Sequence, residues 1–173
     1  MSIINELTEQ TLVDALDLSV RKTFRSMLEI EIDRSEAVAL LKPSPRLSGD
    51  ASALSVVIGW TGELNGSMTL TMSERSALGW TNALLGQNAS SIDQEVVDAV
   101  GELANIIVGN ARAKLDQFEI ESTLPVVIHA GLGSMGLQTN SLDLRLVYDF
   151  MDCQLTLLVA LQRRILAGIP TRD

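Results

Sequence analysis

A long amphipathic segment over residues 93–118 carries the strongest structural signal in the chain. At about 100° per residue, one side of this segment collects aliphatic side chains. These are Val96, Val100, Ala104, Ile107 and Ala111, with Leu103 at the margin. Ser91 and Gln94 stand at the spacing of a capping box. The pattern predicts one helix here, packed through its aliphatic side against the core of the protein.

The other side of this predicted helix collects polar residues and glycine. Asp98, Glu102, Asn105, Gly109 and Arg112 follow one another in steps of four and three residues, so they share one exposed face. A polar face on an amphipathic helix is ordinarily only solvated, and spacing alone favours that interpretation. Asn105 favours a functional role for this face, because asparagine among apolar neighbours costs a helix about half a kcal/mol relative to alanine.

Two glycines, Gly101 and Gly109, flank Glu102 and Asn105 inside the same helix. Each costs a helix interior about 0.8–1 kcal/mol relative to alanine. Their small size would let the backbone of another protein come close to the polar pair. Close packing of the helix on a sheet is the alternative explanation for one of the two. Because local rules broken together tend to mark a functional site, Glu102 and Asn105 form the candidate site.

Shorter periodic segments predict the rest of the fold. Helices are expected over 5–27 and 74–85, the second between an N-cap at Ser73 and Gly86. Strands are expected over 28–32, 37–41, 54–60, 67–72, 120–130, 142–151 and 154–161, with loops at 42–50 and 131–136. This order predicts an α+β fold, in which long helices pack on a mostly antiparallel sheet built from two related halves. Residues 1–165 are expected to form one domain, followed by a loose tail over 166–173.

Composition excludes several classes of function. The formal net charge of −9 argues against nucleic-acid binding. A single cysteine, Cys153, and a single histidine, His129, exclude an internal disulfide, the usual zinc sites and a Cys–His pair. No apolar run is long enough to span a bilayer, and residues 1–10 lack the pattern of a secretory signal. The sequence therefore predicts a soluble, cytoplasmic protein with no membrane contact.

The helix over 93–118 resembles the phosphatase signature of the CheX, CheC and FliY family. That signature is an acidic or hydroxyl residue, three residues, Glu, two residues, Asn, and a proline further on. Asp98, Glu102 and Asn105 match it in type and spacing, and Pro125 looks like the proline, a few residues earlier than usual. The segment 58–70 is similar to the family's strand pair, and the resemblance covers roughly residues 5–162. The first predicted helix has no Glu-x-x-Asn, so the likeness is to CheX, with one motif, rather than to CheC.

The resemblance implies a CheC/CheX-like fold and a phosphatase that hydrolyses the phospho-aspartate of a CheY-like response regulator. Asn105 would orient the attacking water and Glu102 would pair with the receiver's lysine. Asp98, Gly101 and Gly109 would contact the partner. No cofactor of its own is expected, because the response regulator supplies Mg²⁺. A homodimer joined through the sheets is also implied, with the strands at 142–161 as a possible edge.

Two other functions remain open on the residues alone. In the first, the same helix docks a receiver or a flagellar-switch component without accelerating hydrolysis, as a non-catalytic interaction module. In the second, Asp98 and Glu102 are the carboxylate pair of an acid–base hydrolase. One turn apart on a single exposed helix, these two side chains lack the enclosing walls that give paired carboxylates different roles.

Overall fold

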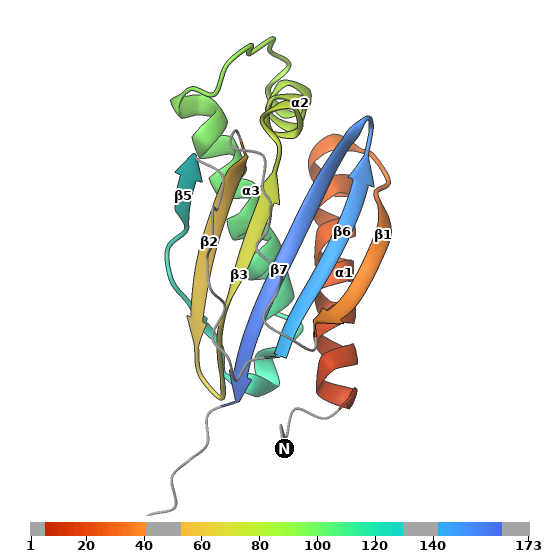
Figure 1. Cartoon of the computed structure of the whole chain (residues 1–173), viewed down its shortest axis with the longest axis vertical. Coiled ribbons are helices and arrows are strands. Elements are labelled where there is room, and N and C mark those ends of the chain that lie inside the picture. The colour runs from red at the N-terminus through yellow and green to blue at the C-terminus, as the bar shows by residue number, and fades with distance from the viewer. Residues whose placement is uncertain (1–5, 41–52, 130–141, 164–173) are drawn as a thin grey trace, which may run out of the picture.

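Seven antiparallel strands form one sheet in the computed structural model, which describes residues 6–40, 53–129 and 142–163 (Figure 1). The helices are α1 (Glu6–Leu28), α2 (Glu74–Leu85) and α3 (Gln94–Arg112), and a 3₁₀ turn, η1 (Asp116–Phe118), follows α3. The strands are β1 (Asp33–Leu40), β2 (Leu54–Thr61), β3 (Leu64–Met72), β4 (Glu121–Ser122), β5 (Val126–His129), β6 (Leu142–Phe150) and β7 (Cys153–Arg163). The predicted α+β class is confirmed.

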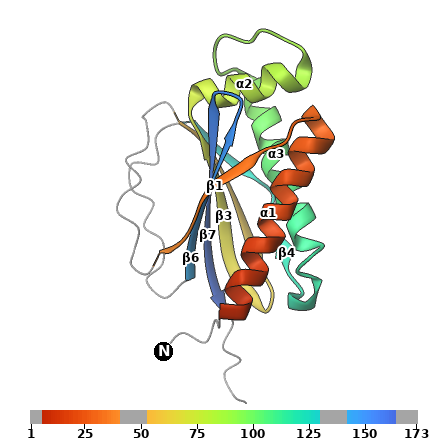
Figure 2. The same ribbon diagram turned by 90° about the vertical axis from the view of Figure 1, so that its right-hand side faces the viewer.

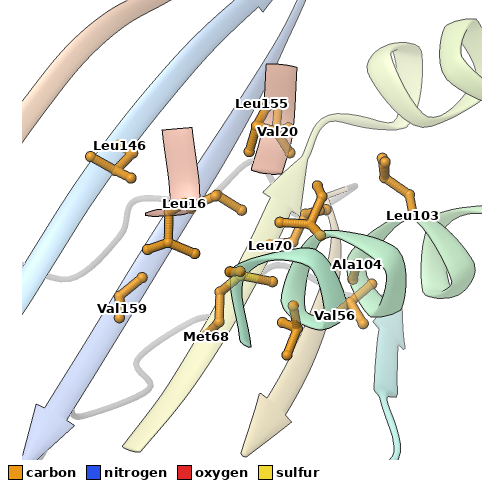
Figure 3. Close-up of a cluster of buried hydrophobic side chains, with 14 of the residues drawn as sticks. Leu16, Val20, Val56, Met68, Leu70, Leu103, Ala104, Leu146, Leu155 and Val159 are labelled. Atoms are coloured by element: carbon orange, nitrogen blue, oxygen red, sulfur yellow. The ribbon is translucent and has the colours of Figure 1, made fainter. Parts of the chain in front are cut away.

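The core lies between the sheet and the helices α1 and α3, which cover the same face of the sheet (Figure 2). Alternate residues of the inner strands point into it, as strand geometry requires. Figure 3 shows Met68 and Leu70 of β3 and Leu155 and Val159 of β7 on the side of the sheet that carries Leu16 of α1. All five side chains are buried. Aliphatic contacts of this kind fix both long helices on the sheet.

The sheet is built from two related halves, as the order of elements predicts. Neighbouring strands run in the order β1-β6-β7-β3-β2, and β2 then pairs with β4 and β5. This order is unchanged when it is read from the other end with β1, β2 and β3 exchanged for β5, β6 and β7. The central pair is β3 with β7, and each outer strand pairs with a strand of the other half. Helices α1 and α3 therefore hold equivalent places, each ahead of an outer strand.

Local signals predict α2 correctly and misplace the start and end of α3. Ser73 caps α2 by accepting a hydrogen bond from Ser76 N at 3.1 Å, and Gly86 follows the helix in the left-handed conformation with φ 65°. The N-cap of α3 is Asp93, not Ser91, and its Oδ1 accepts from Val96 N at 3.0 Å. The helix ends at Arg112 instead of continuing to residue 118.

Three strand predictions need correction. The segment 28–32 is not a strand, because α1 continues to Leu28 and Glu29 then turns the chain with φ 56°. The segment 120–130 is not continuous, since residues 123–125 separate β4 from β5. The strands at 142–161 offer no free edge, because β6 lies between β1 and β7, and β7 lies between β6 and β3. The predicted loops at 42–50 and 131–136, the boundary at residue 165 and the tail at 166–173 lie outside the described residues.

The three helices of the described residues are too short or too polar to cross a bilayer. None of α1, α2 and α3 combines the length and the apolar character that a membrane-spanning helix needs.

Candidate functional site

Helix α3 is anchored in the core through the aliphatic side that the sequence predicts. Val96, Val100, Ala104 and Ile107 are fully buried, and Leu103 and Ala111 are buried beside them. This burial fixes the rotation of the helix about its axis. The opposite side must therefore face outward.

Helix α1 holds one flank of α3 through polar contacts. Ser19 Oγ donates to the carbonyl oxygen of Ile107 at 2.6 Å, and Asn110 Nδ2 donates to Thr23 Oγ1 at 3.3 Å. Ser19 and Thr23 are both buried. Hydrogen bonds made away from water resist sliding of one helix along the other, because a broken one leaves a buried group unpaired.

The edge of the sheet holds the other flank of α3. Arg112 Nη1 donates to Ser122 Oγ of β4 at 3.5 Å. Nearer the start of the helix, a Cβ placed on Gly101 would come within 3.3 Å of Val127 Cγ2 in β5. Helix α3 is thus held on both sides along the stretch that carries the candidate residues.

Between these two flanks lies an exposed row, the α3 strip, which comprises Asp98, Glu102, Asn105, Gly109 and Arg112. Glu102 and Asn105 stand one helical turn apart on the same face. Within the described part of the chain, neither side chain makes a hydrogen bond or an ion pair. Asp98 is partly engaged, since its Oδ1 accepts from Gln94 Nε2 at 2.8 Å. The carboxylate of Glu102 and the amide of Asn105 are therefore available to a partner.

The two glycines of α3 have different surroundings. Gly101 is buried against Val127, which matches the packing alternative for one of the pair. Gly109 is exposed, and a Cβ added there would meet nothing within 4 Å. Packing on β5 accounts for Gly101, whereas only Gly109 leaves the surface of the strip open.

The shape of the site suits insertion into a partner better than enclosure of a small molecule. The strip is the exposed outer surface of a helix, on which Glu102 and Asn105 both face solvent. A small, mostly apolar hollow lies toward the end of α3 and shares only Arg112 with the strip. The remaining residues that line it are Leu12, Leu16, Trp60, Val108, Ala111, Leu115 and Ile120. The same exposure argues against an acid–base pair of Asp98 and Glu102, which would need enclosure.

No metal site accompanies these residues. Across the described ranges, no three His, Cys, Asp or Glu side chains are grouped so that they could hold a metal ion.

A β-bulge that the sequence did not predict lies in the edge segment, residues 121–129, which comprises β4, β5 and the three residues between them. Ser122 pairs with Trp60 and Val126 pairs with Val57, so four steps along the edge match three along β2. Thr123 stays in register with Gly59, donating to its carbonyl oxygen at 2.9 Å and accepting from its N–H through Oγ1 at 3.0 Å. Residues 124 and 125 together therefore oppose Ile58, which is a β-bulge. The proline at 125 was the available signal, since proline in a strand marks a bulge or an edge.

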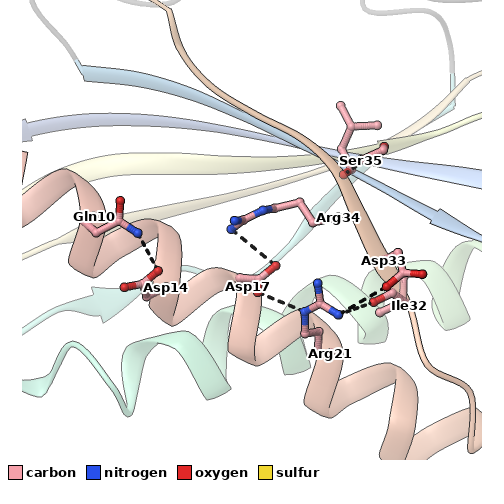
Figure 4. A network of polar contacts seen from close by, with 9 residues as sticks. Gln10, Asp14, Asp17, Arg21, Ile32, Asp33, Arg34 and Ser35 are labelled. Carbon is pink, nitrogen blue, oxygen red and sulfur yellow. Dashed lines mark hydrogen bonds and ion pairs between the residues drawn. The ribbon is translucent and has the colours of Figure 1, made fainter.

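A second polar cluster lies between α1 and β1, on the far side of α1 from the strip (Figure 4). Arg21 Nε contacts Asp17 Oδ2 at 3.0 Å, and Arg21 Nη1 donates to the carbonyl oxygen of Ile32 at 2.8 Å. Arg34 Nη1 lies 3.5 Å from Asp17 Oδ1. Burial raises the pKa of the nearby Tyr148 hydroxyl far above its usual value, and the negative charge of Asp17 adds to the rise. This cluster holds α1 against the sheet, and its charged groups pair with one another.

Sequence comparison identifies a family and a curated relative that this chain resembles. The family described as chemotaxis phosphatase CheX matches residues 54–149. A curated relative from Thermotoga maritima, the CheY-P phosphatase CheX, is 31% identical over 121 residues, which are 68% of this chain and 74% of the relative.

Solved structures with the same fold include two from the same group of proteins. A CheC-like superfamily protein from Shewanella sp. PV-4 superposes with a TM-score of 0.77 at 21% identity, covering 88% of this chain and 97% of that one. The CheX chain in a CheX–CheY–BeF₃–Mg²⁺ complex from Borrelia burgdorferi gives a TM-score of 0.70 at 20% identity, covering 90% and 97%. At these identities the likeness shows the fold.

Proposed function

The chain belongs to the CheX family of chemotaxis phosphatases, and on that premise we propose that it hydrolyses the phospho-aspartate of a CheY-like response regulator. The observation that carries the proposal is the exposed pair Glu102 and Asn105, one turn apart on a helix held rigid on both flanks. The reaction is attack of water on phosphorus, cleavage of the bond to the aspartate oxygen, and release of inorganic phosphate.

Asn105 is proposed to orient the attacking water. A side-chain amide accepts a hydrogen bond from the water through its oxygen and donates through its nitrogen to an oxygen of the phosphoryl group. Phosphoryl transfer depends chiefly on positioning and charge stabilisation, so one well-placed amide is sufficient chemistry for the phosphatase to add. The exposure of Asn105 and its lack of a partner among the described side chains leave both amide functions free for this task.

Glu102 is proposed to pair with the lysine of the receiver's active site and so to set the register of docking. A charge pair across an interface fixes orientation and speeds encounter, although its net contribution to affinity varies. Asp98 is proposed as a peripheral contact, because Gln94 already occupies one of its oxygens. Gly109 is proposed to leave room for the receiver on the exposed face of the helix, whereas Gly101 is buried against β5 and takes no part in that contact.

Mg²⁺ is proposed to enter with the receiver instead of residing in this chain. The Borrelia burgdorferi complex, in which CheX is found with CheY, BeF₃ and Mg²⁺, fits such an arrangement. Because receivers are phosphorylated in the cytoplasm, we also place this protein there.

A homodimer is proposed as well, on the family resemblance and on one feature of the sheet. Among the described strands, β1 pairs only with β6 and so has one unpaired edge, a surface on which strands of two chains can join. Light scattering coupled to size exclusion gives the mass in solution. A monomer at assay concentrations rules the dimer out.

The test of the function measures loss of phosphate from a phosphorylated CheY-like receiver with and without the protein. Wild type should accelerate the loss. Asn105→Ala should remove about a hundredfold of that acceleration, which corresponds to about 2.7 kcal/mol of barrier. Asn105→Asp keeps the shape but cannot donate to the phosphoryl oxygen, so it should be similarly impaired. Glu102→Ala should chiefly raise KM, because docking loses its charge pair.

Asn88→Ala is the matched control, since Asn88 is exposed in the connection between α2 and α3, outside the strip. That variant should behave as wild type. If wild type binds receivers but leaves their rate of dephosphorylation unchanged, the protein is a non-catalytic docking module instead.

A further inference from the structure

Leu124 is the most exposed large hydrophobic residue in the described part of the chain, with 86% of its surface accessible. A single exposed leucine is ordinary on a protein surface and needs no explanation by itself. Leu124 differs because the fold fixes it in place. Thr123 is hydrogen-bonded to Gly59 in both directions on one side of it, and Pro125 and the β5 pairing restrict the chain on the other.

The β-bulge is the reason for this exposure. In a regular strand, residue 124 would alone oppose Ile58, whose side chain is fully buried in the core. Because residues 124 and 125 share that place, the chain bows outward and Leu124 leaves the core side. Bulges commonly re-aim a side chain next to a functional site. Here the bulge turns the side chain of a leucine toward solvent.

The edge segment places Leu124 beside the α3 strip. Ser122 contacts Arg112 at one end of the segment, and Val127 packs at Gly101 at the other. The eleven residues of α3 between these contacts span about 16.5 Å, and the bulged segment, which matches the four steps from Trp60 to Val56, spans about 13 Å. Because its two ends contact opposite ends of this stretch of the helix, the segment runs antiparallel to α3. Leu124 lies between the two contacts, on the stretch of the edge that follows the helix past Asn105 and Gly109.

Asn105 itself belongs to the helix row that borders this segment. Gly101, Asn105 and Arg112 are separated by four and seven residues, which places them along one line of the helix surface. The two outer members of that line contact the edge segment. Leu124 and Asn105 thus lie on adjoining surfaces, one apolar and one polar.

We propose that Leu124 is the apolar anchor on which the receiver docks while Glu102 and Asn105 enter its active site. The inference rests on the proposed function and adds a docking residue to it. Burying a fully exposed leucine side chain at an interface strengthens binding by about tenfold or more, and contacts that exclude water strengthen the polar interactions beside them. The receiver must then present an apolar patch beside its phospho-aspartate.

Steady-state dephosphorylation over a range of receiver concentrations tests the proposal, together with binding of a receiver loaded with Mg²⁺ and BeF₃⁻. Leu124→Ser should raise KM and Kd at least about tenfold while kcat stays within about twofold of wild type. Leu124→Met should restore most of the affinity. Val126→Ser is the matched control. Val126 is also exposed, at 59%, but it projects from the face of the sheet opposite α3, because its neighbour Val127 points to the helix.

The results that would contradict the docking role of Leu124 differ from those that would contradict the proposed function. If Leu124→Ser matches wild type in KM and Kd while Asn105→Ala is inactive, the anchor is wrong and the proposed function stands. If wild type does not speed dephosphorylation, the catalytic proposal fails, and the Kd values still decide whether Leu124 docks the receiver. If Leu124→Ser changes the mass in solution but not the Kd for the receiver, the residue joins copies of this chain and the inference is overturned.

Discussion

Gly109 lies inside α3 in a place where alanine would fit without any clash. Glycine destabilises a helix by about 0.5–1 kcal/mol relative to alanine. We expect Gly109→Ala to raise the free energy of unfolding by about that amount in urea titrations. The same variant should raise KM for the phosphorylated receiver, because the new methyl group stands one turn beyond Asn105 on the docking surface.

Gly101→Ala is the comparison for this prediction. A Cβ there meets Val127 Cγ2 at 3.3 Å, so the Val127 side chain must move by a few tenths of an ångström and the gain in helix propensity should be smaller than at Gly109. A Gly109→Ala protein that gains stability and keeps its KM would show that the receiver does not approach this turn.

At the scale of single elements, the start of α3 gives a prediction about stability. Asp93 Oδ1 accepts from Val96 N at 3.0 Å, and its charge lies at the positive end of the helix. Asp93→Ala should lower the free energy of unfolding by about 1 kcal/mol, as loss of an N-cap usually does. Urea titration measures the change. Ser91→Ala, at the cap position that the sequence favours, should have almost no effect, and the reverse order would contradict the observed cap.

The elements themselves show why some boundaries are predictable and others are not. The two ends of α2 are recognisable because Ser73 directly precedes the segment with helical spacing and Gly86 directly follows it. Ahead of α3, Ser91 and Asp93 compete, and the choice depends on how the preceding loop leaves α2, which is a tertiary matter. The strand expected over 28–32 failed for a related reason. Ile30 and Ile32 are apolar because they pack against the core as a turn, not as a strand.

The candidate site was predictable to the extent that it depends on one helix. Helical spacing alone places Glu102 and Asn105 on one face, and the structure keeps both exposed. What surrounds the pair is not local. The contacts of α3 with α1 and with β5 join residues far apart in sequence, as with Ser19 and Ile107. Leu124 becomes a candidate docking residue only because of the β-bulge, which depends on the pairing of β4 and β5 with β2.

For the molecule as a whole, alkaline unfolding should depend on one residue. Tyr148 is the only tyrosine, and burial raises its pKa in the folded state. Above about pH 10, the unfolded chain loses the tyrosine proton while the folded chain keeps it. Stability therefore falls as pH rises from about 10 toward the higher pKa of the folded state, by at most about 1.4 kcal/mol per pH unit. Tyrosinate absorbance at alkaline pH should appear together with unfolding.

Tyr148→Phe isolates this contribution, because it removes the titrating group and a hydroxyl that has no hydrogen-bond partner within the described chain. Its stability at neutral pH should match or exceed that of wild type, since no hydrogen bond is lost. Its decline above pH 10 should be shallower. Equal alkaline slopes for the two proteins would mean that other groups govern the transition.

The two-half arrangement gives α1 and α3 equivalent places on one sheet while their side chains serve different ends. On α1, Asp17 forms ion pairs with Arg21 and Arg34. Arg21 also donates to the carbonyl oxygen of Ile32, just before β1, and these contacts hold the helix against the sheet. On α3, the side chains of Glu102 and Asn105 are exposed and form no hydrogen bond or ion pair with other described residues. A fold with two equivalent helix positions allows the two helices to take different roles. One helix can serve only to attach to the sheet, and the side chains of the other are then not needed for attachment and can take part in function.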